Sequence, residues 1–378
     1  MTPLALTGAR ILTPDGWLDD HAVVVEQGVV QEVTAVSRLS PGLARRPLDG
    51  GFLVPGFVDV QVNGGGGVLL NDQPTLEGVR AIAAAHRRFG TTALLPTLIS
   101  DDLDVVARAI SAVQAAMAEG VPGVIGIHLE GPFLNEGKRG IHDAGKFRQL
   151  DLAAVELLSP LKGGVTLVTL APERVEPSII RALTDRGVVV SAGHTLATYD
   201  QMRSAADAGL TGVTHLFNAM SPFESRHPGV VGAALDLGLT SGLIVDGHHV
   251  HPAALRVALS ASGPDHLMLV TDAMPTVGSA DKQFTLGGRR IVAQDGTCRA
   301  EDGTLAGSDL DMALAVRNAV RLMGVDLATA STMASATPAQ FLGQGHRMGT
   351  IEPGRRADLV HLDTALGVAG VWIGGAQA

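Results

Sequence analysis

Cysteine is almost missing from this chain of 378 residues, because Cys298 is the only one. A single cysteine excludes an internal disulfide and any metal site built from several thiolates. Positive charge is also short: 28 Lys and Arg stand against 38 Asp and Glu, which gives a net charge of −10. An acidic chain repels polyphosphate, so we expect no nucleic acid partner.

Long apolar runs are missing as well. Mean hydropathy is +0.26, yet no apolar run reaches the roughly 18 residues that a membrane span needs. Residues 1–20 contain a lone Arg10 and no apolar core of signal-peptide length. We therefore expect a cytoplasmic protein with no membrane partner. Only 17% of residues are charged, against an average near a quarter, so much of the chain must be buried.

The two ends of the chain differ from its middle in their pattern of residues. Short β-rich segments separated by glycine turns fill the first fifty residues, and the same style returns from residue 349. We therefore expect one small β domain assembled from residues 1–53 and 347–378. The length suits such a domain beside a large barrel, which we place at residues 54–346.

In the middle, apolar segments alternate with helical ones. Nearly continuous apolar runs are typical of buried parallel strands, and eight of them joined by helices predict an α/β fold, a (β/α)8 barrel. A doubly wound sheet also fits the alternation but normally uses fewer strands. Residues 281–303 are expected as an inserted hairpin. The expected strands lie near residues 54–62, 93–97, 123–130, 165–170, 187–193, 212–216, 242–246 and 267–272, and the expected helices at residues 76–89, 103–118, 152–158, 177–185, 199–208, 252–260 and 310–323.

Polar side chains gather where the expected barrel strands end, which is where barrels place their chemistry. Any one of them is more typical of a structural residue, but packing and solvation do not explain their joint placement. The strand-end residues are Gln61, Asn63, Thr97, His128, Glu130, Glu173, His194, His215, Asn218, Asp246, His248, His249 and Asp272.

Glu130, His194 and His215 form one subset of these residues, a carboxylate and two imidazoles from three strands. Such a set is a common zinc site with an open position for water, and a bound divalent ion lowers the pKa of that water towards 7. The alternative is that Glu130 pairs with a nearby arginine and the histidines line a wet barrel mouth.

Six sequence strings resemble the N-acetylglucosamine-6-phosphate deacetylase family of the amidohydrolase superfamily, and the resemblance runs essentially from end to end. It implies a (β/α)8 TIM barrel of the metal-dependent hydrolase type, with a small β-sandwich domain built from both chain ends. The strings are Val54-Pro-Gly-Phe-Val-Asp-Val-Gln-Val-Asn-Gly64, His128-Leu-Glu-Gly-Pro-Phe133, Ser191-Ala-Gly-His194, Thr214-His-Leu-Phe-Asn-Ala-Met220, Asp246-Gly-His-His249 and Val270-Thr-Asp-Ala273.

The resemblance implies one divalent metal ion per subunit, held by Glu130, His194 and His215. Zinc is the expected ion, with iron or another divalent ion open. Gln61 and Asn63 stand where many amidohydrolases carry His-x-His. Because amides are poor metal ligands, we expect a single tight ion, with these two residues as a candidate water site or weak second-metal site. Strand four also lacks the lysine that bridges two metals in hydantoinase-like relatives.

The resemblance further implies catalytic roles for Asp272, as proton shuttle, and for His142, near the substrate carbonyl. Phosphate needs a cation and several donors, and Arg226 and His249 resemble the family's phosphate contacts. In the family this arginine reaches the neighbouring active site of a homodimer. A turn at residues 305–308 is expected to approach the sugar. The implied substrate-binding residues are Ile141, His142, Asn218, Ala219, Arg226, Asp246, Gly247, His248, His249, Leu305, Ala306 and Gly307.

The activity implied is deacetylation of N-acetylglucosamine 6-phosphate to glucosamine 6-phosphate and acetate, by metal-bound hydroxide. Deacetylation of the galactosamine epimer stays open, because the two sugars differ in the orientation of one hydroxyl and the motifs do not show which orientation the site accepts. A D-aminoacylase or cyclic-amide hydrolase is disfavoured by the missing first-strand histidines and strand-four lysine. A non-catalytic barrel that senses sugar phosphate is disfavoured by the presence of both the three ligands and Asp272.

Overall fold

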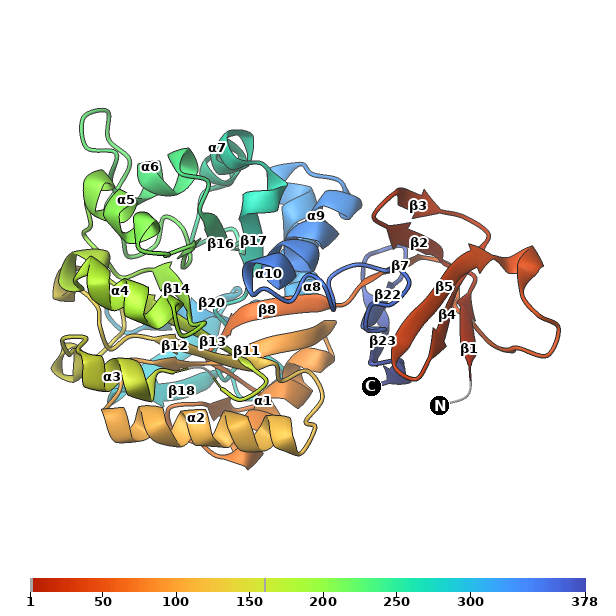
Figure 1. The fold of residues 1–378 in the computed structure, drawn as a ribbon, viewed down its shortest axis with the longest axis horizontal. Coiled ribbons are helices and arrows are strands. Elements are labelled where there is room, and N and C mark those ends of the chain that lie inside the picture. The colour runs from red at the N-terminus through yellow and green to blue at the C-terminus, as the bar shows by residue number, and fades with distance from the viewer. Residues whose placement is uncertain (1–2, 160) are drawn as a thin grey trace.

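Both ends of the chain lie in a smaller, all-β part of the molecule, beside a larger part that contains the helices (Figure 1). The computed structural model describes residues 3–159 and 161–378. Among these residues, no helix combines the length and the apolar composition that crossing a membrane requires.

The larger part is built on eight parallel strands that neighbour one another in chain order. An isolated parallel bridge joins Val62 to Ala273, and the Asp272 N–H donates to Gln61 O over 3.0 Å. These contacts bring the last strand back to the first, so the predicted (β/α)8 barrel is confirmed in a nearly closed form. The strands are β8 (Phe57–Val62), β11 (Thr91–Ile99), β12 (Gly126–Glu130), β13 (Val165–Leu170), β14 (Val189–Ala192), β15 (Gly212–Val213), β16 (Thr240–Ile244) and β17 (Leu267–Val270).

Helices cover the outside of the barrel (Figure 1). The seven expected helices are found, but the stretch 310–323 forms α8 followed by a π-helical turn, Ala319–Met323. Three helices were not expected; one of them, α6, is buried along most of its length and lacks the polar face that produces a helical period. The helices are α1 (Leu76–Arg87), α2 (Leu103–Ala118), α3 (Leu152–Leu157), α4 (Pro177–Thr184), α5 (Tyr199–Asp207), α6 (Gly229–Asp236), α7 (Pro252–Ser262), α8 (Met312–Asn318), α9 (Leu327–Ala334) and α10 (Ala336–Phe341).

The smaller part contains a four-stranded sheet, β5-β4-β1-β6, and a six-stranded sheet, β24-β23-β22-β7-β2-β3. Alternate residues of the six-stranded sheet face opposite ways: Val54 and Val360 join the barrel core, whereas Leu53 and Leu359 pack with Leu6 of the four-stranded sheet. This sheet is therefore the middle layer. The strands are β1 (Leu4–Thr7), β2 (Arg10–Thr13), β3 (Gly16–Leu18), β4 (His21–Glu26), β5 (Val29–Ala35), β6 (Ala44–Pro47), β7 (Phe52–Pro55), β22 (Leu359–Leu362), β23 (Val368–Ile373) and β24 (Ala376–Gln377).

The strand expected at residues 54–62 is in fact two strands that meet at Gly56. The Gly56 N–H donates to Asp358 O over 2.8 Å, and a Cβ there would lie 2.1 Å from Thr92 Oγ1. The chain therefore leaves β7 of the middle layer and enters β8 of the barrel at a residue that must be small. The division at residues 53 and 347 stays a proposal.

The expected insertion is a four-stranded antiparallel sheet of β18 (Gln283–Leu286), β19 (Arg289–Gln294), β20 (Thr297–Ala300) and β21 (Leu305–Ser308). Both two-residue loops, at Gly287-Gly288 and Asp295-Gly296, have positive φ at each position, as type I′ hairpin turns require. The turn predicted at residues 305–308 is wrong. That segment is strand β21, which pairs with β20 through Leu305 and Ser308 and buries the alternate residues Ala306 and Ser308.

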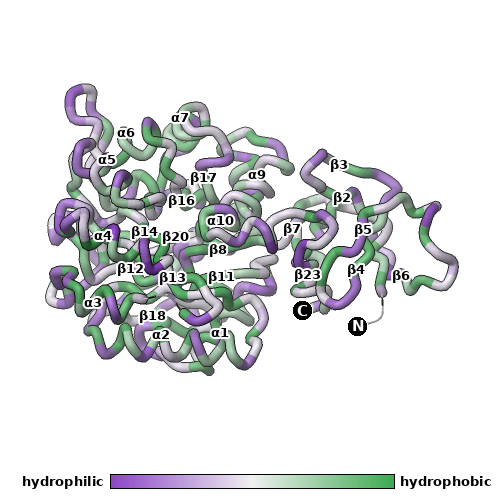
Figure 2. Tube along the Cα trace, in the orientation of Figure 1, coloured by the Kyte–Doolittle hydropathy of each residue, from purple (hydrophilic) through white to green (hydrophobic). Residues whose placement is uncertain are grey.

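Hydropathy follows this architecture (Figure 2). Hydrophobic residues colour the interior of the barrel, whereas the loop that projects before α6 is mostly hydrophilic. The largest buried apolar cluster runs through the barrel and its helices, and smaller clusters lie between the two sheets of the β part and under the inserted sheet. The barrel's carboxyl ends therefore sit on a rigid support.

Candidate active site

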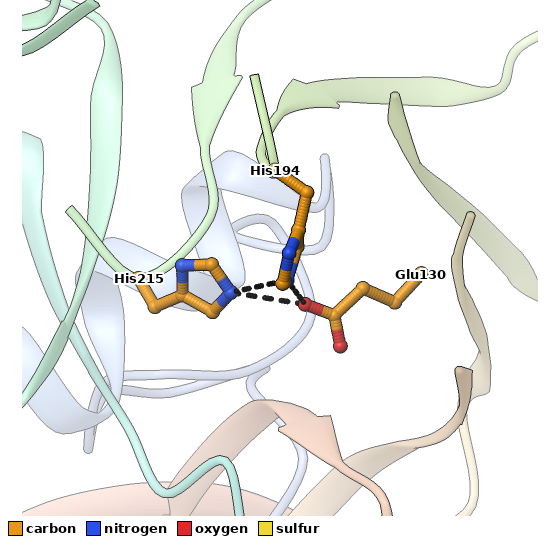
Figure 3. A group of neighbouring side chains, drawn as sticks. All are labelled: Glu130, His194 and His215. Atoms are coloured by element: carbon orange, nitrogen blue, oxygen red, sulfur yellow. Dashed lines mark hydrogen bonds and ion pairs between the residues drawn. The ribbon is translucent and has the colours of Figure 1, made fainter. Parts of the chain in front are cut away.

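Three predicted ligand side chains converge at the carboxyl ends of the barrel strands (Figure 3). Glu130 ends β12, whereas His194 and His215 follow β14 and β15. Glu130 Oε1 lies 3.2 Å from His194 Nε2 and 3.0 Å from His215 Nε2, and the two nitrogens are 3.1 Å apart. Ligand atoms around a tetrahedral ion with bonds of about 2.0 Å are about 3.3 Å apart. The spacing therefore fits one divalent ion.

The hydrogen bonds behind these ligands suit the same ion. His194 Nδ1 lies 2.8 Å from Lys138 O, so Nδ1 carries the proton and the lone pair of Nε2 faces the other ligands. Burial opposes ionisation of Glu130, but its bonds with His194 and His215 outweigh burial and hold its pKa well below the usual range. A carboxylate and an unprotonated imidazole are the states in which these groups bind metal. In the described part of the chain, this is the one such group of three.

Gln61 and Asn63 turn their amide nitrogens towards carboxylates. Gln61 Nε2 donates to Glu130 Oε1 and to Asp272 Oδ1, each over 3.1 Å, and Asn63 Nδ2 donates to Asp272 Oδ1 over 2.7 Å. Gln61 does not line the cavity described below. In this arrangement both side chains act as hydrogen-bond donors to the carboxylates of the site.

Asp272 faces the three ligands from the end of β17. Burial and, after it, the negative charge of Glu130 raise the pKa of Asp272 to about 6. The hydrogen bonds from the side-chain amides of Gln61 and Asn63 both go to Oδ1 of Asp272, which leaves Oδ2 to exchange a proton. A buried carboxyl group with one free oxygen beside the three ligands is placed to accept and return a proton, as general acid–base chemistry requires.

Three of these residues have a left-handed backbone. The φ angles are +49° at His194, +34° at His215 and +52° at Asp272, a region that residues other than glycine rarely occupy. Such positions cost roughly 1–3 kcal/mol each and concentrate at functional sites. The backbone around Asp272 is fixed on both sides, since its N–H donates to Gln61 O and its C=O accepts from the Ser308 N–H over 2.9 Å.

A cavity of about 450 Å³ opens over the ligands. His142 lies in its wall with its ring centroid 4.3 Å from that of His194. Nδ1 of His142 accepts from the Ser100 N–H over 3.3 Å, so Nε2 carries the proton and can donate to a carbonyl. Burial and then His194 lower the pKa of His142 to about 3, which keeps the ring neutral. The predicted residues in the wall are Asn63, Glu130, Ile141, His142, His194, His215, Asn218, Ala219, His249, Asp272, Leu305 and Gly307.

Other predicted residues lie outside this wall. Asp246 Oδ2 bonds His249 Nδ1 over 2.6 Å, which fixes the ring and leaves Nε2 for the cavity that His249 lines. Arg226 lines a separate cleft of about 650 Å³, and His248 lines another of about 440 Å³. Ala306 is fully buried, and Gly247 is exposed beside His248.

Sequence reasoning missed several residues of the cavity wall, of which Glu136, Lys138 and Arg139 are charged. The segment containing them links β12 to the predicted His142. The sequence did contain one signal for this segment: the adjacent cations Lys138 and Arg139 stand shortly before His142, a predicted site residue.

Comparisons with known proteins agree with this geometry. A profile of the Amidohydrolase family matches residues 52–377, and one of the NagA composite domain matches residues 4–53. The chain is 43% identical to the N-acetylgalactosamine-6-phosphate deacetylase of Shewanella sp. (strain ANA-3), over 98% of this chain and 95% of that protein.

Two solved structures are similar over nearly their whole length. The N-acetylglucosamine-6-phosphate deacetylase of Pasteurella multocida has a TM-score of 0.96 at 32% identity, over 100% of this chain and 99% of that chain. A mutant of the N-acetyl-D-glucosamine-6-phosphate deacetylase of Mycobacterium smegmatis, in complex with N-acetyl-D-glucosamine-6-phosphate, has a TM-score of 0.91 at 35% identity, over 100% and 98%.

Proposed function

The chain belongs to the amidohydrolase family, and from this premise we propose that it removes the acetyl group of an N-acetylated amino sugar 6-phosphate. The observation that carries the proposal is the buried triangle of Glu130, His194 and His215 facing Asp272 across one cavity. N-acetylglucosamine 6-phosphate is the proposed substrate. The products are glucosamine 6-phosphate and acetate.

The three ligands would hold one divalent ion, for which we propose zinc. Such an ion supplies Lewis acidity towards the acetyl carbonyl and lowers the pKa of the attacking water. His142 donates its Nε2–H to the carbonyl oxygen and stabilises the negative charge that develops there. Asp272 takes the proton of the attacking water at Oδ2 and returns it to the sugar nitrogen. That nitrogen must be protonated before it can leave as an amine.

We propose that Arg226 binds the substrate phosphate of the neighbouring subunit in a homodimer. Its loop projects from the body before α6 (Figure 1), and Arg226 lines a cleft other than the cavity over the ligands. A guanidinium that serves a phosphate must then reach another chain's cavity. His249, which lines the cavity of its own chain, supplies a second phosphate contact.

Arg226→Ala tests the phosphate contact. A lost charged hydrogen bond is worth roughly 1.5–3 kcal/mol, so KM for the 6-phosphate sugar should rise about 10- to 100-fold. Activity on unphosphorylated N-acetylglucosamine should stay nearly unchanged. Arg108→Ala, on the exposed face of α2, is the control. An unchanged KM would refute the contact.

Mixed dimers test the sharing between subunits. If Arg226 serves the partner's site, a dimer of one Arg226→Ala chain and one Asp272→Asn chain has one site with both lesions and one site with neither; if it serves its own chain, each site has one lesion. Recovered turnover of the 6-phosphate sugar supports sharing. No recovery in verified mixed dimers means that Arg226 serves its own chain.

The galactosamine epimer is a second candidate substrate, favoured by the 43% identity to the Shewanella enzyme. Acetate release from both epimers, with and without added zinc, decides between them by the ratio of kcat/KM. No release from either sugar by zinc-loaded protein would overturn the enzyme proposal and favour a sugar-phosphate sensor. The cytoplasmic location stays a prediction.

A further inference from the structure

Glu173 is a half-buried carboxylate that the proposed mechanism does not use. It follows β13, the fourth barrel strand, in the short 3₁₀ turn Pro172–Arg174. β13 itself supplies none of the three ligands. No ion pair among residues 3–159 and 161–378 involves Glu173, so its protein partners there are hydrogen-bond donors.

Both carboxylate oxygens of Glu173 accept hydrogen bonds from neutral donors. Oε1 accepts from the Leu196 N–H over 2.6 Å and from Asn135 Nδ2 over 2.8 Å. Oε2 accepts from the hydroxyl of Thr195, whose side chain is completely buried. Thr195 and Leu196 are the two residues that follow His194, so Glu173 fixes the chain on the C-terminal side of that ligand.

Asn135, which donates to Glu173, is linked by further hydrogen bonds to the backbone and the imidazole of His194. The Asn135 N–H donates to His194 O over 3.0 Å, and Asn135 Oδ1 accepts from the Gly137 N–H over 2.9 Å. That bond caps the turn Glu136–Lys138, and Lys138 O is the partner of His194 Nδ1. Glu173 therefore holds both the backbone after His194 and the segment that orients its ring.

We propose that Glu173 is a positioning residue that fixes the left-handed backbone and the ring orientation of His194, and so sets the affinity of the metal site. The proposal rests on the proposed metal-dependent function. The left-handed conformation of His194 needs support from outside the local chain, and partners behind metal ligands typically change metal affinity 10- to 100-fold. Among the described residues, the Thr195 hydroxyl donates only to Glu173 and accepts from the Ala197 N–H over 2.9 Å. Glutamine would place its NH₂ group against this hydroxyl and leave the hydroxyl proton without its acceptor.

The test compares Glu173→Gln with Glu176→Gln, a matched control on the exposed residue before α4, which makes no side-chain cap bond. Zinc affinity is measured by competition with a chelator, and the cobalt-substituted proteins are compared by absorption spectroscopy. We expect Glu173→Gln to weaken zinc binding about 10- to 100-fold and to change the cobalt spectrum, with the control like the wild type. A residue that merely stabilises the loops would lower the melting temperature and leave both readouts unchanged.

Wild-type zinc affinity and spectrum in folded Glu173→Gln protein would overturn the inference. A wild-type protein that binds no zinc would instead overturn the proposed function, so the two failures are distinguishable. If Glu173→Gln does not fold, Asn135→Ala breaks the same connection and should weaken zinc binding in the same direction. Unchanged affinity in that variant overturns the inference as well.

Discussion

Asp59 lies inside the barrel directly below the site, and ionisation of its buried carboxyl group should lower the stability of the fold. It is 0% exposed, and its Oδ1 accepts from the backbone N–H groups of Gln61 (3.2 Å) and Thr271 (3.3 Å). Oδ2 accepts from the Thr271 hydroxyl. Burial raises the pKa of Asp59 to about 7 from 3.8, and these hydrogen bonds only partly oppose it.

The raised pKa gives a defined pH dependence of stability. The folded state holds a proton on Asp59 more tightly than the unfolded state, so its stabilising effect is complete below pH 3.8 and is lost as pH rises towards 7. A difference of about 3 pKa units at 1.36 kcal/mol each corresponds to about 4 kcal/mol. Asn in this position stays neutral, accepts both backbone bonds through its oxygen and donates to the Thr271 hydroxyl. Asp59→Asn should therefore gain stability relative to wild type as pH rises from 4 to 8, by at most about 4 kcal/mol.

The assay is urea unfolding of both proteins between pH 4 and 8, with a chelator present so that metal binding does not contribute. Asp265→Asn, at an exposed carboxyl, is the control and should follow the wild type. A constant difference between Asp59→Asn and wild type over this range would refute the reasoning, because it would mean that Asp59 does not titrate there.

Three further predictions concern the site itself. Asp272→Asn should lose roughly 10²–10⁴ in kcat, the usual range for a general acid–base group, while it keeps its metal; near-normal turnover of metal-loaded protein would exclude the shuttle. Elemental analysis of protein purified without chelator should give about one divalent ion per chain, and two tight ions would contradict the donor roles of Gln61 and Asn63. Wild-type kcat should fall as pH drops through the pKa of Asp272, because a protonated carboxyl cannot accept a proton. Burial and the charge of Glu130 raise that pKa to about 6 and a bound cation lowers it, so an acid midpoint well above 6 would argue against Asp272.

The barrel was predictable because its strands are almost entirely apolar and its polar residues stand at their ends. Strand ends alone gave a larger set of candidates that includes Glu130, His194, His215 and Asp272, and the resemblance to the deacetylase family assigned their roles. The boundary at Gly56 was missed although Pro55-Gly56 is a dipeptide that commonly interrupts a strand. Apolar residues stand on both sides of it, and the pairing that separates β7 from β8, such as the Gly56 N–H bond to Asp358 O, is made with distant residues.

Contacts between loops that are distant in the chain also could not be predicted from the sequence. Glu173 is visible as a strand-end residue, but its partners are 38 residues before it and 22 to 23 after it. No local period links such positions. The same holds for Lys138, whose role as the partner of His194 depends on a backbone carbonyl that any residue could supply.

The left-handed backbones at His194, His215 and Asp272 lower the stability of the fold at the residues that the chemistry needs. At roughly 1–3 kcal/mol each, the three together approach the 5–15 kcal/mol by which proteins are usually stable. Glycine would relieve each conformation and remove the reacting group in the same step. An engineer seeking a hardier enzyme must leave these three positions untouched and look for stability elsewhere in the barrel.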